Sequence, residues 1–349
     1  MNPDLWSFIG EKAALSGALI GLALVVAMYS TWAERKVAAY IQDRHGPSRA
    51  GWGGLLQPLA DGGKLFFKEE ITPRHAEKFL FILGPTLAMI LALMTGAVIP
   101  WSSSFMWGEV EITPLIADVN IGFLYILGVL SLGVYGMLIG AWASNNKWSL
   151  MGGLRGASQI ISYEIPLGLA LLTVLMITGS LRLDVIVSQQ MDGYWNIVLQ
   201  PLGFVIFLIC SFAETNRTPF DLPEAENELI GGYHSEYSSM KLGFFLFAEY
   251  VNMFISSVIL ATLYFGGYDI PFVNDEKLAE SLGMNAMAIL HFITLFAKAC
   301  MFIFLFMWVR WTIPRFRYDQ LMDLGWKRLL PLAIANLLIT GFVILYFFN

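Results

Sequence analysis

Long apolar windows alternate with polar segments along the chain, and this pattern predicts the fold. Eight windows are long and apolar enough to cross about 30 Å of hydrocarbon as helices. The fourth is the weakest, because Glu164 and Pro166 interrupt its start. We therefore predict one domain over residues 1–349, an all-α integral membrane protein forming a bundle of eight transmembrane helices with long cytoplasmic loops. The predicted spans run from Ala13 to Trp32, Phe79 to Ile99, Ile121 to Ala143, Ile160 to Gly179, Trp195 to Phe212, Leu242 to Phe265, Ala286 to Trp308 and Leu329 to Phe348.

The composition agrees with this class. Apolar residues make up 57% of the chain and charged residues only 14%, whereas soluble domains are roughly half apolar. Cys210 and Cys300 lie inside apolar windows without ligand spacing, so neither a disulfide nor iron–sulfur ligation is indicated. The N-terminal segment lacks a basic flank followed by a cleavage site, which predicts a retained first span.

Lysine and arginine set the predicted orientation. The loops after the first, third, fifth and seventh spans cover residues 33–78, 144–159, 213–241 and 309–328, and they hold most of the basic residues. By the positive-inside rule these loops face the cytoplasm and both termini face the periplasm. The other loops and the N-terminal segment hold only Lys12, Arg182 and Lys277.

The first loop is too long for a simple turn. Leu55, Leu59 and Phe66 recur at near-helical spacing, with charged residues on another face. The segment is either an amphipathic helix in the plane of the membrane interface or a helix buried against partner subunits. We find no internal repeat, which argues mildly against inverted-repeat transporters.

An acid-rich stretch, residues 213–228, follows the fifth span directly. The run Asp221-Leu222-Pro223-Glu224 predicts a helix start with Asp221 as the N-cap, and Gly231-Gly232 predict its end. Asp221, Glu224 and Glu228 would then share one helix face. Arg217 is the only cation between Arg182 and Lys241. Like charges this close raise some pKa values, so part of the set is expected to carry protons; the alternative is an ordinary acidic loop that pairs with a partner subunit.

Four more ionisable residues lie in or next to the predicted spans: Glu34, Glu164, Glu249 and Lys298. A carboxylate at the bilayer centre costs roughly 2.5–3.5 kcal/mol, so such groups usually line a wet cavity or a proton path. A structural ion pair explains any one of them, but a hydrated charged path explains all four together with the loop acids. His291 is interpreted as a hydrogen-bonding partner of a neighbouring helix.

No nucleotide-binding, zinc-protease or cysteine-ligand motif is present, so the chain carries no recognisable redox centre of its own. Several long motifs, in order along nearly the whole chain, instead resemble one family, the H subunits of bacterial respiratory complex I, which is the proton-pumping NADH:quinone oxidoreductase. These motifs are AERK at 33–36, YIQDRHGP at 40–47, GLLQPLAD at 54–61, ISYEIP at 161–166, AETNRTPFDLPEAE at 213–226, YHSEY at 233–237, WVR at 308–310 and PRFRYDQLM at 314–322.

The resemblance implies a subunit that helps to form the quinone chamber and begins a row of charged residues leading to antiporter-like subunits. Small departures at 48–50 and 62–63 put only the local helix in doubt. Positions matching the quinone chamber or its entrance are Arg35, Asp61, Lys64, Phe220 and Arg310. Positions matching the acidic path are Glu164, Glu214, Arg217, Glu224, Glu226, Glu228 and Glu249, to which the acid-rich stretch adds Asp221.

The resemblance also implies partners and a substrate. Quinone is the expected substrate, no cofactor is expected to be covalently bound, and FMN and iron–sulfur clusters are expected only in partner subunits. The expected partners are the hydrophilic quinone-module subunits, the small and antiporter-like membrane subunits and membrane lipids, without nucleic acid, in the bacterial plasma (inner) membrane. Three alternatives remain at this stage: the anchor subunit of a membrane-bound hydrogenase, a self-sufficient cation-coupled transporter, and a purely structural anchor.

Overall fold

The computed structural model describes residues 3–108, 110–271, 273, 275, 278 and 282–347, without the side chains of residues 3–7, 226 and 347. Nearly all regular structure in this part is helical. The helices are α1 (Pro3–Ile41), α2 (Gln57–Phe67), α3 (Lys78–Met94), α4 (Gly122–Ala143), α5 (Lys147–Thr178), α6 (Leu183–Asp192), α7 (Asn196–Leu199), α8 (Pro201–Glu214), α9 (Glu226–Leu229), α10 (Ser239–Tyr264), α12 (Met284–Thr312), α13 (Tyr318–Asp323) and α14 (Leu330–Phe347). Short 3₁₀ helices η1 (Trp52–Gly54), η2 (Thr95–Val98) and η3 (Gly232–His234), the π-helical segment η4 (Leu324–Leu329) and a hairpin of β1 (Phe105–Trp107) with β2 (Val110–Ile112) complete the set.

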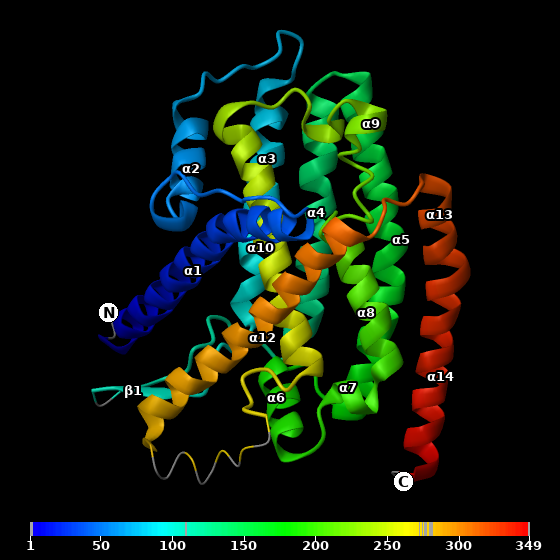
Figure 1. Ribbon diagram of the computed structural model, residues 1–349. Helices are drawn as coiled ribbons and strands as arrows, with labels where there is room; N and C mark the ends of the chain where they lie inside the picture. The colour runs from blue at the N-terminus through cyan, green and yellow to red at the C-terminus, as the bar shows by residue number, and fades with distance from the viewer. Residues whose placement is uncertain are drawn as a thin grey trace.

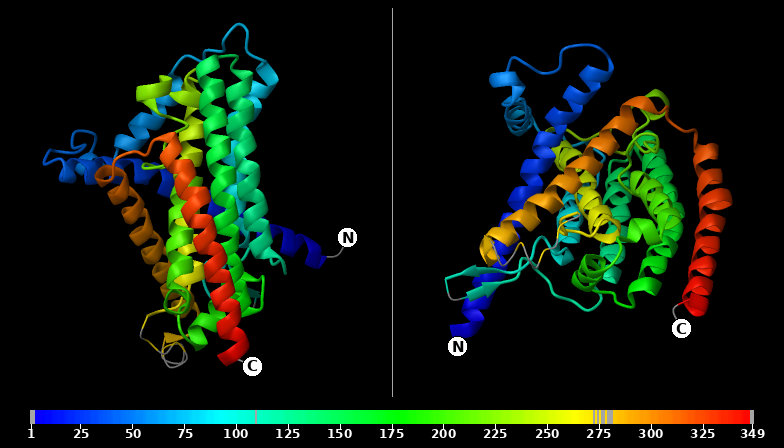
Figure 2. Two further views of the ribbon diagram at one scale, coloured as in Figure 1. Left: turned by 90° about the vertical axis from the view of Figure 1, so that its right-hand side faces the viewer. Right: turned by 60° about the horizontal axis from the view of Figure 1, so that its bottom comes forward.

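Seven helical stretches in the described residues are long and apolar enough to cross a membrane. Six correspond to α1, α3, α4, α5, α10 and α12, and the seventh runs through α13, η4 and α14 from Tyr318 to Tyr346. These helices stand side by side, with α1 and α12 strongly inclined to the others (Figures 1 and 2). The chain is therefore a multi-pass helical membrane protein, as the apolar pattern predicts.

The fifth predicted span is the exception, because it is broken at Gln200. Helix α7 ends at Leu199, Gln200 adopts φ −134° and ψ 58°, and Pro201 begins α8. A residue before proline is driven out of the helical region by contact with the proline ring, and proline lacks the N–H that would continue the helix. Helix α8 alone has 14 residues, so it falls short of the length of the other seven stretches.

Several helices are longer than their apolar windows. Helix α5 begins at Lys147, where the side chain of Asn146 accepts a hydrogen bond from the backbone N–H of Trp148 (2.9 Å), so it takes up most of the predicted loop 144–159. Helix α1 likewise continues past Trp32 to Ile41. Hydropathy marks only the part of a helix that needs lipid, and the helix itself ends where capping or turn geometry ends it.

Helix α10 lies at the centre of the bundle (Figure 1). Beside it, the backbones of α3 and α4 approach each other very closely. A Cβ added at Gly84 of α3 would lie 2.7 Å from the Cα of Gly140 in α4, and one at Gly136 would lie 2.8 Å from the backbone nitrogen of Ala88. Small residues at such a contact let two membrane helices approach closely.

Lys298 does not join the acid network, contrary to the prediction of one charged path. Its ammonium donates to the backbone oxygens of Phe265 (2.7 Å), Gly267 (2.9 Å) and Asp269 (2.6 Å), just beyond the end of α10. Carbonyls of one turn converge on this ammonium, and a buried cation needs such acceptors. Lys298 therefore holds together the turn that follows α10, at the end of the bundle away from α2.

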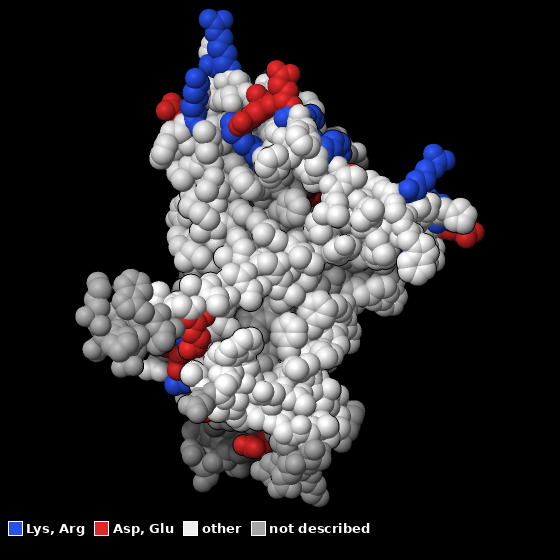
Figure 3. All heavy atoms as spheres, turned by 90° about the vertical axis from the view of Figure 1, so that its left-hand side faces the viewer, with Lys and Arg blue, Asp and Glu red and all other residues white. Residues whose placement is uncertain are grey.

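Charged side chains are unevenly spread over the surface. On the face in Figure 3 they gather toward the end that carries α2, with a smaller group toward the opposite end and a broad uncharged belt between. Helix α2 itself leaves Leu59 and Phe66 exposed, so its apolar side is not covered by this chain.

Candidate functional site

A buried cluster of ion pairs lies where α1, α10, α12 and the segment after α8 meet. Arg217, only 1% exposed, lies at its centre: Nη1 is 2.7 Å from Glu34 Oε2, and Nε is 2.7 Å from Glu249 Oε1. Arg310 Nη1 approaches the other oxygen of Glu34 at 2.6 Å. Tyr250 donates its hydroxyl to Glu34 (2.9 Å) and places its ring 4.2 Å from the Arg217 guanidinium. Two carboxylates and two guanidinium groups thus neutralise one another.

The turn that follows α8 positions Arg217 at the centre of the charge cluster. Helix α8 ends at Glu214, Asn216 adopts φ 50°, and the backbone N–H of Arg217 donates to Phe212 (3.2 Å). Burial opposes the charged form of Arg217, but the carboxylates of Glu249 and Glu34 raise the pKa of its guanidinium above the ordinary value. Arginine therefore stays charged here, and each partner carboxylate keeps a cation beside it.

A pocket of about 510 Å³ adjoins this cluster on the side of α2, and Glu34 and Tyr250 form part of its wall. Arg35, Asp61 and Lys64, three of the five predicted chamber residues, also line it. The guanidinium of Arg35 lies 2.7 Å from Asp61, which further accepts from Gln57 (3.1 Å). Apolar side chains complete the wall: Met28, Leu65, Leu242, Leu246, Phe247 and Trp311.

The other two predicted chamber residues lie behind this wall. Arg310 reaches the pocket only through its pair with Glu34. Phe220 is 3% exposed, and its ring packs between those of Tyr163 and Phe316, with centroid distances of 5.3 and 5.5 Å. It holds the acid-rich stretch against α5 and the segment after α12.

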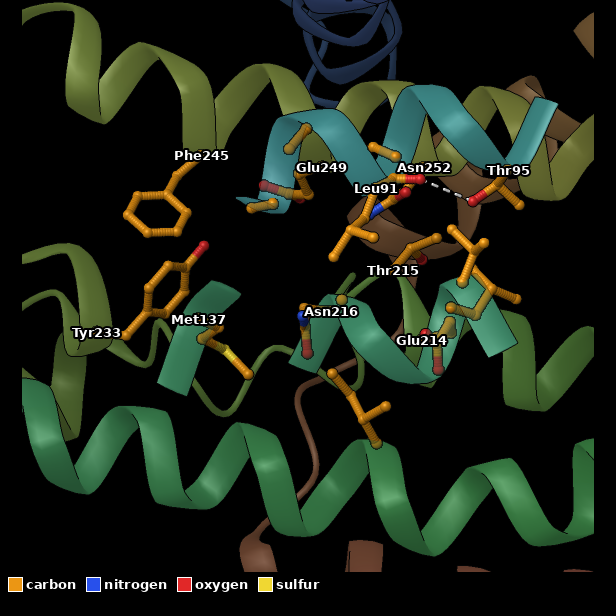
Figure 4. Close-up of a pocket in the computed structure, with 17 residues that line it drawn as sticks. Leu91, Thr95, Met137, Glu214, Thr215, Asn216, Tyr233, Phe245, Glu249 and Asn252 are labelled. Carbon is orange, nitrogen blue, oxygen red and sulfur yellow. Dashed lines mark hydrogen bonds between the residues drawn. The ribbon is translucent and has the colours of Figure 1, made fainter. Parts of the chain in front are cut away.

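Two further cavities continue from the cluster into the bundle. A small one, about 70 Å³, has both Glu249 and Glu214 in its wall, together with Thr215, Asn216 and Tyr233 (Figure 4). A second, about 220 Å³, has Glu214, Glu164 and Ser131 in its wall. Glu214 therefore belongs to the walls of both cavities, and the predicted acids Glu249, Glu214 and Glu164 follow one another from the cluster to the face formed by α4 and α5.

The acid-rich stretch does not form the predicted helix. Helix α9 covers only Glu226–Leu229, and Ala225, not Asp221, precedes it. Residues 221–225 instead fold back on the glycine pair, because the backbone N–H of Tyr233 donates to Pro223 (3.3 Å). A helix start at Asp221 fits the local residue types, but contacts distant in sequence decide the conformation here.

Consequently the predicted acids of this stretch do not share one face. Asp221 pairs with Arg315 at 2.5 Å. Glu224 accepts from the Tyr233 hydroxyl (3.1 Å) and lies 3.6 Å from His234. Glu228 lies at the surface, half exposed, and pairs with Arg155 at 2.5 Å. The side chain of Glu226 lies outside the described part of the chain.

Burial sets the protonation of the two inner acids. It raises the pKa of Asp221 to about 6, although Arg315 acts in the opposite direction. Burial, with the nearby charges of Glu249 and Asp221, raises the pKa of Glu224 well above its ordinary value. Both shifts agree with the expectation that part of this set carries protons near neutral pH.

Asp221 gives a pH-dependence that can be measured. Because its pKa is raised, the folded chain holds this proton more tightly than the unfolded chain, so its contribution to stability falls as the pH rises from 3.8 to about 6. In infrared titration we expect a carboxyl band that ionises near pH 6 and is lost in Asp221→Asn. Asp319→Asn, at an exposed position, serves as the control and keeps the band. A band that persists in Asp221→Asn would refute the assignment.

The interpretation of His291 is confirmed for one of its two partners. Its ring nitrogens contact Asp275 (3.1 Å), a helical residue between α10 and α12, and Ser103 (2.9 Å), in the segment before β1. Three residues at the site were not predicted: Tyr250, Tyr233 and Arg315. Tyr250 directly follows Glu249, and Arg315 lies in one of the motifs quoted above, but nothing local indicates which acid each would contact.

The fold and the site define a class: a multi-pass membrane protein whose bundle holds a neutralised charge cluster between a large pocket and a row of carboxylates. A family model described as NADH dehydrogenase matches residues 14–341. The H subunit of NADH-quinone oxidoreductase from Flavobacterium johnsoniae is 60% identical over 339 residues, covering 97% of this chain and 96% of that protein. The H 1 subunit from Cytophaga hutchinsonii is 60% identical over 342 residues, covering 97% and 98%.

A more distant relative, NADH-quinone oxidoreductase subunit 8 of Rhodothermus marinus, is 46% identical over 335 residues, covering 94% of this chain and 95% of that protein. The chain belongs to the NADH dehydrogenase family, among the H subunits of NADH-quinone oxidoreductases. The resemblance seen in the motifs is confirmed.

Proposed function

We propose that this chain is the membrane subunit of a proton-translocating NADH:quinone oxidoreductase that forms part of the quinone chamber and couples quinone reduction to proton movement. One observation carries the proposal. The cluster of Glu34, Arg217 and Glu249 joins the wall of the 510 Å³ pocket to the cavities lined by Glu214 and Glu164.

The pocket suits an oil-soluble acceptor with a polar headgroup. Apolar side chains of α1, α2, α10 and α12 form much of its wall, while Arg35, Asp61, Lys64 and the Tyr250 hydroxyl offer hydrogen-bonding groups. Binding sites of this kind combine a mostly apolar surface with a few polar groups that fix orientation. The quinone is the substrate here, and its electrons arrive from FMN and iron–sulfur clusters in partner subunits.

The coupling step follows from the ion pairs. A change of charge or protonation beside Glu34 alters its balance with Arg217 and Arg310, and Arg217 passes that change to Glu249 because it contacts both acids. Glu249, Glu214 and Glu164 then exchange protons along the cavities toward neighbouring membrane subunits. Moving one charge against 100 mV takes about 2.3 kcal/mol, and one pKa unit is worth about 1.4 kcal/mol, so shifts of a few units are adequate.

We also propose how the chain crosses the membrane. Helices α7 and α8 together make one crossing, which gives eight crossings and places both termini on the periplasmic side of the bacterial inner membrane. The basic loops then face the cytoplasm, where hydrophilic partner subunits dock, and small and antiporter-like membrane subunits contact the chain laterally.

Glu214→Gln tests the coupling step. Glutamine keeps the size of the side chain but does not take up a proton, so it interrupts a proton path through position 214, and we expect proton movement per NADH oxidised to fall to a small fraction of the wild-type value. The measurement uses inverted membrane vesicles containing the whole complex, with quinone reduction and acidification of the lumen followed together.

Glu111→Gln is the matched control, because Glu111 is an exposed glutamate of β2 that belongs to none of the predicted sites. It should leave both activities close to wild type. If Glu214→Gln also pumps at the wild-type rate, the chain is a structural anchor and the proposal fails.

A further inference from the structure

The start of α10 adopts a conformation that its own residues do not favour. Ser238 precedes the helix, where a serine hydroxyl usually accepts from a backbone N–H of that helix, but it accepts instead from the backbone N–H of Ile71 (3.0 Å). Ser239 adopts φ 56°, a left-handed conformation that residues with side chains disfavour. Lys241 places a cation in the first turn, where the helix dipole is itself positive. Such unfavourable features persist only where surrounding contacts hold them in place.

These residues contact the end of α2 and the segment that follows it. The Ser239 hydroxyl donates to the carbonyl of Leu65 (3.0 Å), which belongs to the last turn of α2, where carbonyls lack a partner within the helix. The Lys241 ammonium lies 2.6 Å from Glu70 Oε1 and donates to the hydroxyl of Thr72 (3.2 Å). We call this set of contacts the clasp: Ser238, Ser239 and Lys241 at the start of α10 with Leu65, Glu70, Ile71 and Thr72.

The clasp lies at one corner of the 510 Å³ pocket, where its walls of α2 and α10 meet. Leu65 lines the pocket from α2, and Leu242, the residue after Lys241, lines it from α10. Leu65 also packs against α10, because a Cβ added at Gly243 would lie 3.5 Å from its Cδ1. Among the described clasp residues only Leu65 lines the pocket, so the others act on it by fixing the distance between its two walls.

A second attachment of α2, to α1, is weaker. Arg35 pairs with Asp61 at 2.7 Å, but the side chain of Arg35 is half exposed, and exposed pairs contribute little to stability. The Lys241 side chain is only 13% exposed, and its ammonium also lies 5.2 Å from the centroid of the buried Phe81 ring in α3. Because the clasp adds this cation–π contact to an ion pair and three hydrogen bonds, the position of α2 against α10 depends mainly on the clasp.

We propose that Lys241 is a positioning residue for the quinone, because the clasp holds α2 at the distance from α10 at which the pocket binds this substrate. The inference rests on the proposed function, since it takes this pocket as the quinone site. Without the clasp, α2 moves away from α10, and the arrangement that binds quinone is less populated. The apparent affinity for quinone then falls by the same factor. The groups that carry protons are untouched, so turnover at saturating quinone is retained.

Steady-state kinetics of the intact complex with NADH and decylubiquinone test the clasp. Lys241→Met keeps an unbranched apolar side chain but removes the charge. We expect its KM for decylubiquinone to rise about two- to fivefold, the range over which a partly exposed ion pair shifts a population, while kcat and the KM for NADH stay close to wild type. Glu70→Gln, at an exposed position that tolerates substitution, should act in the same direction. The matched controls are Glu69→Gln, an exposed neighbour, and Lys327→Met, whose pair with Asp323 is exposed; both should keep the wild-type KM.

Two further variants separate the clasp from the pocket itself. Lys241→Glu combined with Glu70→Lys restores the ion pair with its charges exchanged, so it should bring the KM back toward wild type, which a general packing defect would not do. Leu246→Trp narrows the pocket directly and should raise the KM for decylubiquinone. If only Leu246→Trp raises it, the pocket remains the quinone site and the inference about the clasp is wrong. If no variant raises it, the pocket is not the quinone site and both proposals fail. A lower kcat at unchanged KM in Lys241→Met would also overturn the inference, because the clasp would then serve folding alone.

Discussion

Replacing Arg217 with leucine is expected to destabilise the folded chain by about 3–5 kcal/mol, the usual cost of removing one partner from a buried ion pair. Glu249 would lose the guanidinium that lies 2.7 Å from its carboxylate, and Glu34 would keep only one of its two arginines, Arg310, beside the Tyr250 hydroxyl. The temperature at which the purified complex irreversibly loses NADH:quinone activity should fall accordingly. Quinone reduction should also fall at temperatures where the variant is still assembled.

Two companion variants make the Arg217 experiment specific. Arg317→Leu removes an arginine whose pair with Asp319 is largely exposed, so it should behave like wild type. Arg217→Leu combined with Glu249→Gln removes both members of one pair and should recover part of the lost stability, because no uncompensated carboxylate remains at that position. An Arg217→Leu complex with wild-type thermal stability would show that this cluster does not hold the bundle together.

Replacing Gly232 with alanine should be nearly as damaging. Gly232 adopts φ 62°, and a Cβ there would lie 1.7 Å from the carbonyl oxygen of Pro223 and 3.0 Å from the Cα of Glu224. A left-handed conformation alone costs a residue with a side chain roughly 1–2 kcal/mol, and the backbone clash adds to that. The acid-rich stretch would have to move away from η3, which would break the contact between Glu224 and Tyr233.

Gly179 supplies the control for the clash. It has φ 65° at the end of α5, and a Cβ there would meet nothing within 4 Å, so Gly179→Ala incurs only the conformational cost. We expect thermal inactivation of the complex to shift modestly for Gly179→Ala and much further for Gly232→Ala. Equal shifts would mean that the close approach to Pro223 contributes nothing.

The membrane fold was largely predictable because hydrocarbon imposes one simple requirement, a long apolar helix, on each crossing. The observed helices differ from the predicted spans where a segment does not need to be apolar or where a single residue breaks the helix. Helix α5 extends to Lys147 through residues that need no lipid, and Gln200 breaks a window that is apolar on average because the following residue is proline. Hydropathy averages over a window and does not respond to a single backbone break.

The sequence singled out the buried acids of the candidate site, but not the residues with which they pair. A carboxylate at depth needs a partner, so Glu34, Glu164 and Glu249 could be singled out from their positions alone. Their partners come from distant segments: Arg217 lies 183 residues from Glu34, and Arg315 lies 94 residues from Asp221. The partners of Lys298 could not be predicted either, because they are backbone carbonyls, and every residue type carries one.

The position of Glu214 between two cavities limits how much of the bundle would have to move. Glu214 reaches both the cavity shared with Glu249 and the cavity shared with Glu164, and it stands on the last turn of α8. If Glu214 carries protons as we propose, rotation about its own side-chain bonds would present its carboxyl group to each cavity in turn. Such rotamer changes are fast compared with helix or domain movements. The surrounding backbone would then not have to move for the transfer.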